Sequence, residues 1–223
     1  VQMHTAHAAT TADLSSSLLS TLLSVEEAAS FCLTNLTYRH PANRHRLMAA
    51  GGASVLVSVL RAYTGPMQHD SATASTCSTA DSGGGGNSGS GGSTTSTVGS
   101  QVGTVLSRAC MVLDNLAASE SCQEEIVQAD VMEAVCATML AFPAARELQF
   151  SGCRILGRLA ESCQNGKCQQ QQHQRQVRLR AVRANAVVAV ARAFERFCQT
   201  DAATARMASA ALQCLTALWS DSK

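Results

Sequence analysis

The sequence predicts an all-α fold of stacked helices, because one leucine-rich phrase occurs in it four times. In each copy two leucines lie three residues apart, and a tiny residue precedes the first leucine by four positions. One helical turn before a buried leucine, a tiny side chain leaves room for another helix to approach closely. The leucine pairs are Leu33 with Leu36, Leu113 with Leu116, Leu156 with Leu159, and Leu215 with Leu218; the tiny residues are Ala29, Ala109, Gly152 and Ala211.

The spacing of the copies indicates one repeat period with two insertions. Counted at the position before the second leucine, the copies lie at 35, 115, 158 and 217, so the steps are 80, 43 and 59 residues. The step of 43 falls within the range of about 40–47 residues for helical repeats of two or three helices. A Gly/Ser/Thr-rich segment of 37 residues, 64–100, reduces the first step to 43, and a glutamine tract at 169–172 explains most of the excess in the last.

Each unit is predicted to contain a short first helix, a second helix and a longer third helix that bears the phrase. The corner between the first two helices falls at Gly51, Asp130 and Asn185 in successive units. Gly, Asp and Asn tolerate best the left-handed conformation that ends a helix. Before these units, leucine periodicity predicts a helix over 13–24 and another over 25–38, which Pro41 follows.

The predicted organisation is an N-terminal tail over residues 1–12 and a repeat domain over 13–223. The domain begins with a partial repeat, 13–40, and a repeat, 41–119, that contains a disordered loop over 64–100. A repeat over 120–162 follows, and the last, 163–220, contains a Gln-rich insertion over 164–174.

Composition suits thin helical layers and excludes several functional classes. The chain is 46% hydrophobic but only 4% aromatic, and its net charge is +1. Such a charge gives no global field for nucleic acid, and no apolar run approaches the ~20 residues that span a bilayer. The N-terminus lacks a signal-peptide pattern, so we expect an intracellular protein, cytoplasmic or nuclear and not secreted. Because the sequence begins with Val1, we expect a fragment or a processed form.

The ten cysteines and six histidines predict neither catalysis nor a metal centre. Cys163 and Cys168 with His173 lack the second ligand pair of a zinc site. The histidines fall in predicted termini, turns or loops without a nucleophile partner at motif spacing, so we expect no enzyme and no cofactor. Four other cysteines fall beside core positions of the leucine helices, where free thiols behave as small hydrophobes: Cys32, Cys110, Cys153 and Cys214.

A three-helix unit with this phrase resembles the armadillo repeat. The best stretch runs from Ala28 to Ala62 and the second best from Arg108 to Leu140, with weaker copies at 147–198 and 203–219. The resemblance implies a right-handed α-solenoid of about three to four repeats, whose third helices line a concave groove. In such proteins the asparagine of each third helix often binds the backbone of an extended peptide. That role would fall to Asn35 and Asn115, with arginine at 158 and alanine at 217 in the other copies.

One turn earlier, the groove-facing row would contain Phe31, Met111, Arg154 and Gln213. Importin-α-type adaptors place tryptophan in this row to hold lysines, and no tryptophan occurs at these four positions. Together with Arg154, Arg158 favours an acidic or mixed-charge peptide over a basic one. Each pair also has a structural interpretation: the two asparagines would brace neighbouring backbone, the two arginines would form a solvated face, and Phe31 with Met111 would fill the core.

The sequence therefore favours a scaffold or adaptor that binds a protein partner or extended peptide in the groove. The alternative is a structural segment of a longer solenoid in a large assembly, without a peptide groove. RNA binding ranks last. It would use the arginine-rich stretch 175–196, which contains Glu195 as its only acidic residue and is more simply a solvated outer face.

Overall fold

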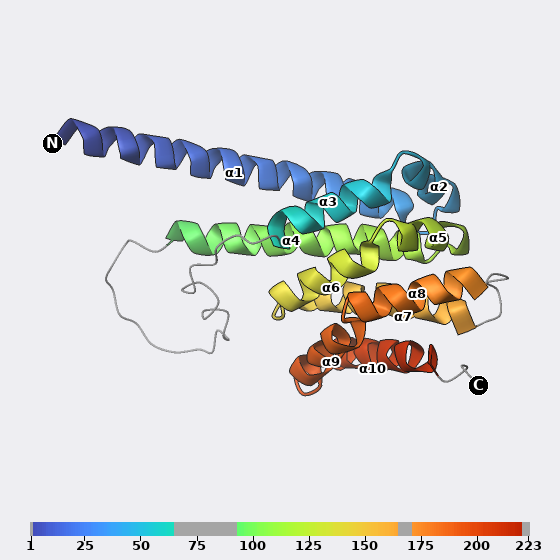
Figure 1. The fold of residues 1–223 in the computed structure, drawn as a ribbon. Coiled ribbons are helices and arrows are strands. Elements are labelled where there is room, and N and C mark those ends of the chain that lie inside the picture. The colour runs from blue at the N-terminus through green and yellow to red at the C-terminus, as the bar shows by residue number, and fades with distance from the viewer. Residues whose placement is uncertain (1, 65–92, 165–170, 220–223) are drawn as a thin grey trace.

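The computed structural model describes residues 2–64, 93–164 and 171–219. Within these ranges the chain forms ten α-helices and no strand, which confirms the all-α prediction. Figure 1 shows long helices lying roughly side by side, with shorter helices packed along one side of them.

The ten helices form three rows, and successive members of each row are in contact (Figure 1). The chain visits the rows in turn, so that each layer takes one helix from each, except that α1 stands alone in the first layer. The row of long third helices comprises α1 (Gln2–Thr37), α4 (Ser93–Ala117), α7 (Arg146–Gln164) and α10 (Ala202–Ala217). The second-helix row comprises α3 (Gly52–Thr64), α6 (Val131–Ala141) and α9 (Ala186–Phe197), and the first-helix row α2 (Pro41–Ala49), α5 (Glu120–Gln128) and α8 (Gln171–Arg183).

The three predicted corners adopt the left-handed backbone conformation. The φ angle is +76° at Gly51, 59° at Asp130 and 52° at Asn185, and each residue lies between a first and a second helix. The left-handed region is strained for residues with a Cβ, and Asn and Asp are the non-glycine residues that visit it routinely. The chain therefore turns at the same place in each of the three layers.

We expect Asn185→Ala to lower the free energy of unfolding by about 1 kcal/mol, because alanine lacks the local hydrogen bonding that eases a left-handed backbone. Asn185→Gly should retain or slightly raise stability, since glycine adopts this conformation without steric cost. Denaturant unfolding of the two variants and the parent measures both changes. Equal stability of the alanine and glycine variants would contradict a strained corner.

The beginning of the chain differs from the prediction. A single helix, α1, runs from Gln2 to Thr37, where a tail over 1–12 and two helices over 13–24 and 25–38 were predicted; residue 1 lies outside the described residues. The sequence from 2 to 37 contains neither Gly nor Pro, so nothing in it ends the helix before Thr37. The first break comes at Arg39, whose φ is 54°, just before Pro41.

Helices also extend into both predicted insertions. Ser93–Ser100 begins α4 within the predicted loop 64–100, and Gln171–Gln174 begins α8 within the predicted insertion 164–174. Thr64 and Gln164, the first residues of those two ranges, end α3 and α7. The remainder of the loops, residues 65–92 and 165–170, lies outside the described residues.

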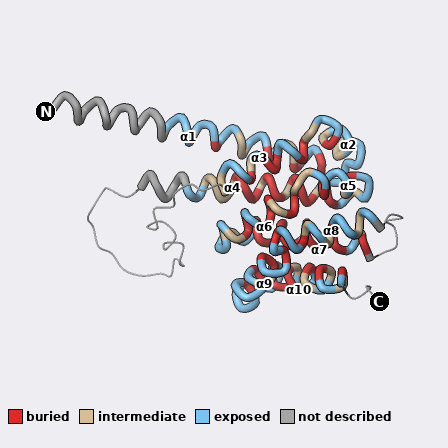
Figure 2. The backbone as a smooth tube through the Cα atoms, in the orientation of Figure 1, coloured by how far each residue is buried: buried red, intermediate tan, exposed pale blue. Residues whose placement is uncertain are grey.

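The core lies between the layers, and among the described helices only one side of α1 is packed against neighbours. The second phrase leucine is fully buried at 116 and 159 and nearly so at 218, whereas Leu36 is 56% exposed. Figure 2 shows α1 mostly exposed where it is described, while buried positions recur along α4 and α7. Cys32 follows the same pattern, because it is exposed whereas its counterparts Val112 and Ile155 are fully buried. Burial of the phrase therefore depends on having a layer before it.

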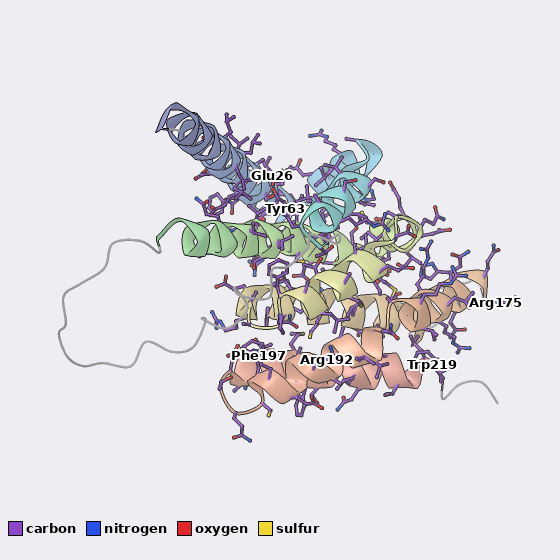
Figure 3. The ribbon with its side chains drawn as sticks, turned by 60° about the vertical axis from the view of Figure 1, so that its left-hand side comes forward. Glu26, Tyr63, Arg175, Arg192, Phe197 and Trp219 are labelled. Carbon is purple, nitrogen blue, oxygen red and sulfur yellow. The ribbon has the colours of Figure 1, made fainter. Side chains whose placement is uncertain are left out.

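Glu26 and Tyr63 fix α1 against α3. The Tyr63 hydroxyl donates to Glu26 Oε2 at 2.7 Å, and the two side chains point toward one another in Figure 3. Burial and this acidic partner raise the pKa of Tyr63 to about 12, so the hydroxyl keeps its proton at neutral pH. Glu26 therefore lies within α1 and has its partner on another helix.

Candidate functional site

All six predicted site residues lie on consecutive third helices. Phe31 and Asn35 are on α1, Met111 and Asn115 on α4, and Arg154 and Arg158 on α7. The two α1 residues are exposed, and the four on α4 and α7 are partly exposed. The predicted positions thus fall on adjacent helices and keep side-chain surface open to solvent.

An arginine that sequence reasoning missed joins Phe31 to Met111. The Arg108 guanidinium lies over the Phe31 ring, 5.0 Å from its centroid, and its Nη1 lies 3.9 Å from the Met111 sulfur. On α7, the Arg154 guanidinium similarly lies 5.5 Å from the centroid of the Phe150 ring. Stacked arginine–aromatic pairs therefore occur twice among the third helices, once between α4 and α1 and once within α7. Their only sequence signal is the helical spacing of Phe150 and Arg154.

Asn115 contacts the helix before it. Its Nδ2 donates to the Thr34 carbonyl at 3.1 Å and lies 3.2 Å from the Thr37 hydroxyl, both on α1. These bonds match the structural interpretation of Asn115, in which its side chain braces the backbone of a neighbouring helix. A peptide in the groove would have to compete for the same donor.

Arg158 makes the equivalent bond one layer later. Its Nη1 donates to the carbonyl of Asp114 on α4 at 2.6 Å. Residues 115 and 158 occupy the same place in the phrase, and residues 34 and 114 likewise occupy a common place. The polar position of the phrase thus connects each third helix to the preceding one at two successive junctions.

Asp114 pairs with both predicted arginines. Its Oδ2 lies 3.0 Å from Arg154 Nη2, and its Oδ1 lies 2.9 Å from Arg158 Nη1, while its side chain is only 6% exposed. Burial raises the pKa of the Asp114 carboxyl, and the two guanidiniums act in the opposite direction. The two arginines are therefore neither free binding groups nor a simple solvated face, because the Asp114 carboxylate on α4 partly compensates their positive charge. Sequence reasoning missed Asp114, although it lies inside the phrase itself.

The arginine-rich outer stretch is also partly paired. Arg180 on α8 forms ion pairs with Asp130 and, at 2.9 Å, with Glu133, and Arg61 on α3 pairs with Asp130 at 3.2 Å. Arg192 on α9 is exposed on the outer helices (Figure 3). These pairs connect α3, α6 and α8 and reduce the positive charge available to a nucleic acid.

The described residues contain no group of three or more His, Cys, Asp or Glu side chains that could hold a metal ion. Burial raises the pKa values of Cys110, Cys136 and Cys153 to about 12, so these thiols are protonated at neutral pH and are poor nucleophiles. A cavity of about 100 Å³ between α5 and α8 includes Glu124 and His173 in its lining. It is smaller than the roughly 300–1,000 Å³ of typical ligand pockets.

Across the described helices, none is by itself both long and apolar enough to cross a bilayer. Only α2 and α3 taken together meet the length and composition, and they are bent by 72° at their junction. The sequence matches no protein family, no curated protein and no solved structure. The contacts on the third helices are therefore the basis for a functional proposal.

Proposed function

We propose that the chain is an armadillo-type, right-handed α-solenoid that acts as a scaffold for protein–protein interaction. Three features support this fold: contacts within each of three helix rows, left-handed corners at equivalent positions, and equivalent hydrogen bonds from Asn115 and Arg158. Repeat arrays of this kind present extended surfaces and commonly bind other macromolecules.

The binding surface is the row of third-helix side chains, which we call the arginine–aromatic strip: Phe31, Arg108, Met111, Phe150 and Arg154. The single observation that supports it is that each guanidinium lies over an aromatic ring on a partly open surface. Both pairs offer apolar area, and Arg108 adds positive charge, whereas the charge of Arg154 is partly compensated by Asp114. Arginine and aromatic side chains dominate many interfaces. An extended segment with apolar side chains and acidic neighbours fits this chemistry best.

Asn35 adds a backbone-binding group at one end of the strip. It is exposed, and among the described residues its side chain has no hydrogen-bond partner. An amide donates and accepts simultaneously, which matches a peptide unit. Since Asn115 is engaged with α1, peptide contacts would concentrate on Asn35 and on the arginine–aromatic strip.

The alternative proposal is a structural segment without a peptide groove. The bonds from Asn115 and Arg158 favour it, because the polar row then serves to connect layers. Under this alternative the arginine–aromatic strip would bind no peptide, and its side chains would only cover the junctions.

Selection from a phage-displayed library of random peptides tests the groove. We expect enriched peptides with hydrophobic and acidic residues, and we expect the double variant Phe31→Ala/Arg108→Ala to bind them at least about tenfold more weakly, a loss of about 1.4 kcal/mol. Arg192→Ala is the matched charge control, since Arg192 is exposed on α9, outside the strip. A library without enriched sequences, or equal affinity for the double variant and the parent, would favour the structural alternative.

A further inference from the structure

One face of α1 presents an apolar stripe to solvent. Its residues follow alternating steps of four and three, the spacing of a helix–helix seam. Leu18, Leu22, Val25 and Leu36 are between 56% and 65% exposed, and Ala29 and Cys32 between them are also exposed. The stripe, which we call the α1 outer face, contains no charged residue.

The equivalent stripe is covered in the later layers. On α4 the counterparts of Val25, Ala29, Cys32 and Leu36 are fully buried: Val105, Ala109, Val112 and Leu116. On α7 the corresponding residues Leu148, Ile155 and Leu159 are also fully buried. The exposure of the α1 outer face is thus an effect of position, because the same pattern is a packed surface wherever a layer precedes it.

A close contact in the last junction shows which surface covers this stripe. Ala211 on α10, the counterpart of Ala29, lies against Gly157 of α7, where an added Cβ would be 3.4 Å from the Ala211 Cα atom. At the two earlier junctions, Asn115 and Arg158 donate to the carbonyls of Thr34 and Asp114, which are the counterparts of Gly157. The complementary surface is therefore the far side of a preceding third helix.

On α10 no described helix covers the corresponding far side. The counterparts of Thr34 and Thr37 there are Thr216, which is exposed, and Trp219, which is 41% exposed. In the inner layers the position of Trp219 is taken by Ala117 and Ala160, both fully buried. The outer face of α1 and the far side of α10 thus match the two halves of one inner junction, and the described residues named for these halves carry no charge.

We propose that a second copy of this chain docks head to tail, with the α1 outer face of one copy on the far side of α10 of the other. The contact repeats the internal junctions: Ala29 takes the place of Ala211, and the Asn35 amide donates to the Thr216 carbonyl. In a docked copy Asn35 therefore does not contact a peptide. Such a contact is heterologous and does not close on itself, so it produces open chains of copies. Because α1 stands alone in its layer, the contact is confined to two helices and belongs to the small, weak class of interfaces.

Sedimentation and light scattering of two blocked variants test this docking. Leu22→Glu blocks the α1 outer face, and Trp219→Glu blocks the far side of α10. A reducing agent prevents disulfides through Cys32, and circular dichroism verifies that both variants are folded. We expect the parent to associate progressively above about 10 µM, as small interfaces do, and each variant alone to remain monomeric. An equimolar mixture should form one-to-one heterodimers and nothing larger, because each variant keeps one intact half.

Leu179→Glu is the control and should associate like the parent. Leu179 is 50% exposed on α8 and lies outside both halves of the proposed contact, which involves α1 and the far side of α10. A parent that stays monomeric to about 500 µM, far above that range, would overturn the proposal and leave the face to a different partner. Self-association of the Trp219→Glu variant would also overturn it, because that result requires symmetric pairing of two α1 helices. The peptide-binding variant Phe31→Ala/Arg108→Ala changes neither the α1 outer face nor the far side of α10. Loss of peptide binding and loss of docking can therefore be measured separately.

Discussion

Leu116→Asp is expected to abolish cooperative folding, whereas Leu36→Asp is expected to leave the protein folded. The two leucines occupy the same place in the phrase, but Leu116 is fully buried between layers and Leu36 is 56% exposed. A carboxylate placed at 116 would have no partner in an apolar interior, at a cost of roughly 5 kcal/mol or more. At 36 the carboxylate stays in water, and the change should be within about 0.5 kcal/mol.

Thermal melts followed by far-UV circular dichroism measure both effects. They should be recorded at about 2 µM, below the range in which a weak interface would cover Leu36. We expect the Leu36→Asp melting temperature to lie within about 2 °C of the parent. Comparable losses from both substitutions would contradict the terminal position of α1, because they would require Leu36 to be buried in the monomer.

Asp114→Ala is expected to reduce the free energy of unfolding by about 3 kcal/mol. Its side chain is 6% exposed and pairs with Arg154 and Arg158, so its removal leaves two partly buried guanidiniums without their common counterion. Breaking a buried pair from one side is more costly than the pair's net contribution, because the remaining charge stays desolvated. In a chain of this size the melting temperature should fall by about 6–12 °C.

Glu147→Ala provides the matched control for Asp114→Ala. Glu147 also pairs with an arginine, Arg146 at 3.6 Å, but both side chains are mostly exposed. Exposed ion pairs contribute less than about 1 kcal/mol, so this variant should melt close to the parent. Equal destabilisation by the two substitutions would show that Asp114 is no more important than a surface charge.

The sequence was sufficient to predict the features that depend on local chemistry and periodicity. Gly51, Asp130 and Asn185 mark corners because few residue types adopt a left-handed backbone, and the structure confirms all three. The leucine spacing likewise placed the third helices. The continuity of α1 was not predicted: the segment was divided into a tail and helices over 13–24 and 25–38, although it contains neither Gly nor Pro to end a helix at either boundary.

Side-chain partners on the third helices were beyond a one-sequence argument. Asn115 and Arg158 were placed on the right surface, but their bonds to Thr34 and Asp114 depend on the distance between adjacent helices. Asp114 fell between two leucines of the phrase and carried no pattern of its own. Its importance comes from two arginines some forty residues later, which only the packing of α7 on α4 brings within 3.0 Å.

The central claim is that the third helices are equivalent layers, and cooperative melting of a chain that lacks one layer tests it most directly. Deleting residues 113–155 removes one step of 43 residues and joins Val112 to Leu156 in phase. We expect this shortened chain to retain its helicity per residue and to melt in one transition at a lower temperature, because stability in such arrays sums over layers. Deleting 134–176, an equal length out of phase, should leave no cooperative transition. Absence of a cooperative transition in the in-phase deletion would contradict the equivalence of the layers.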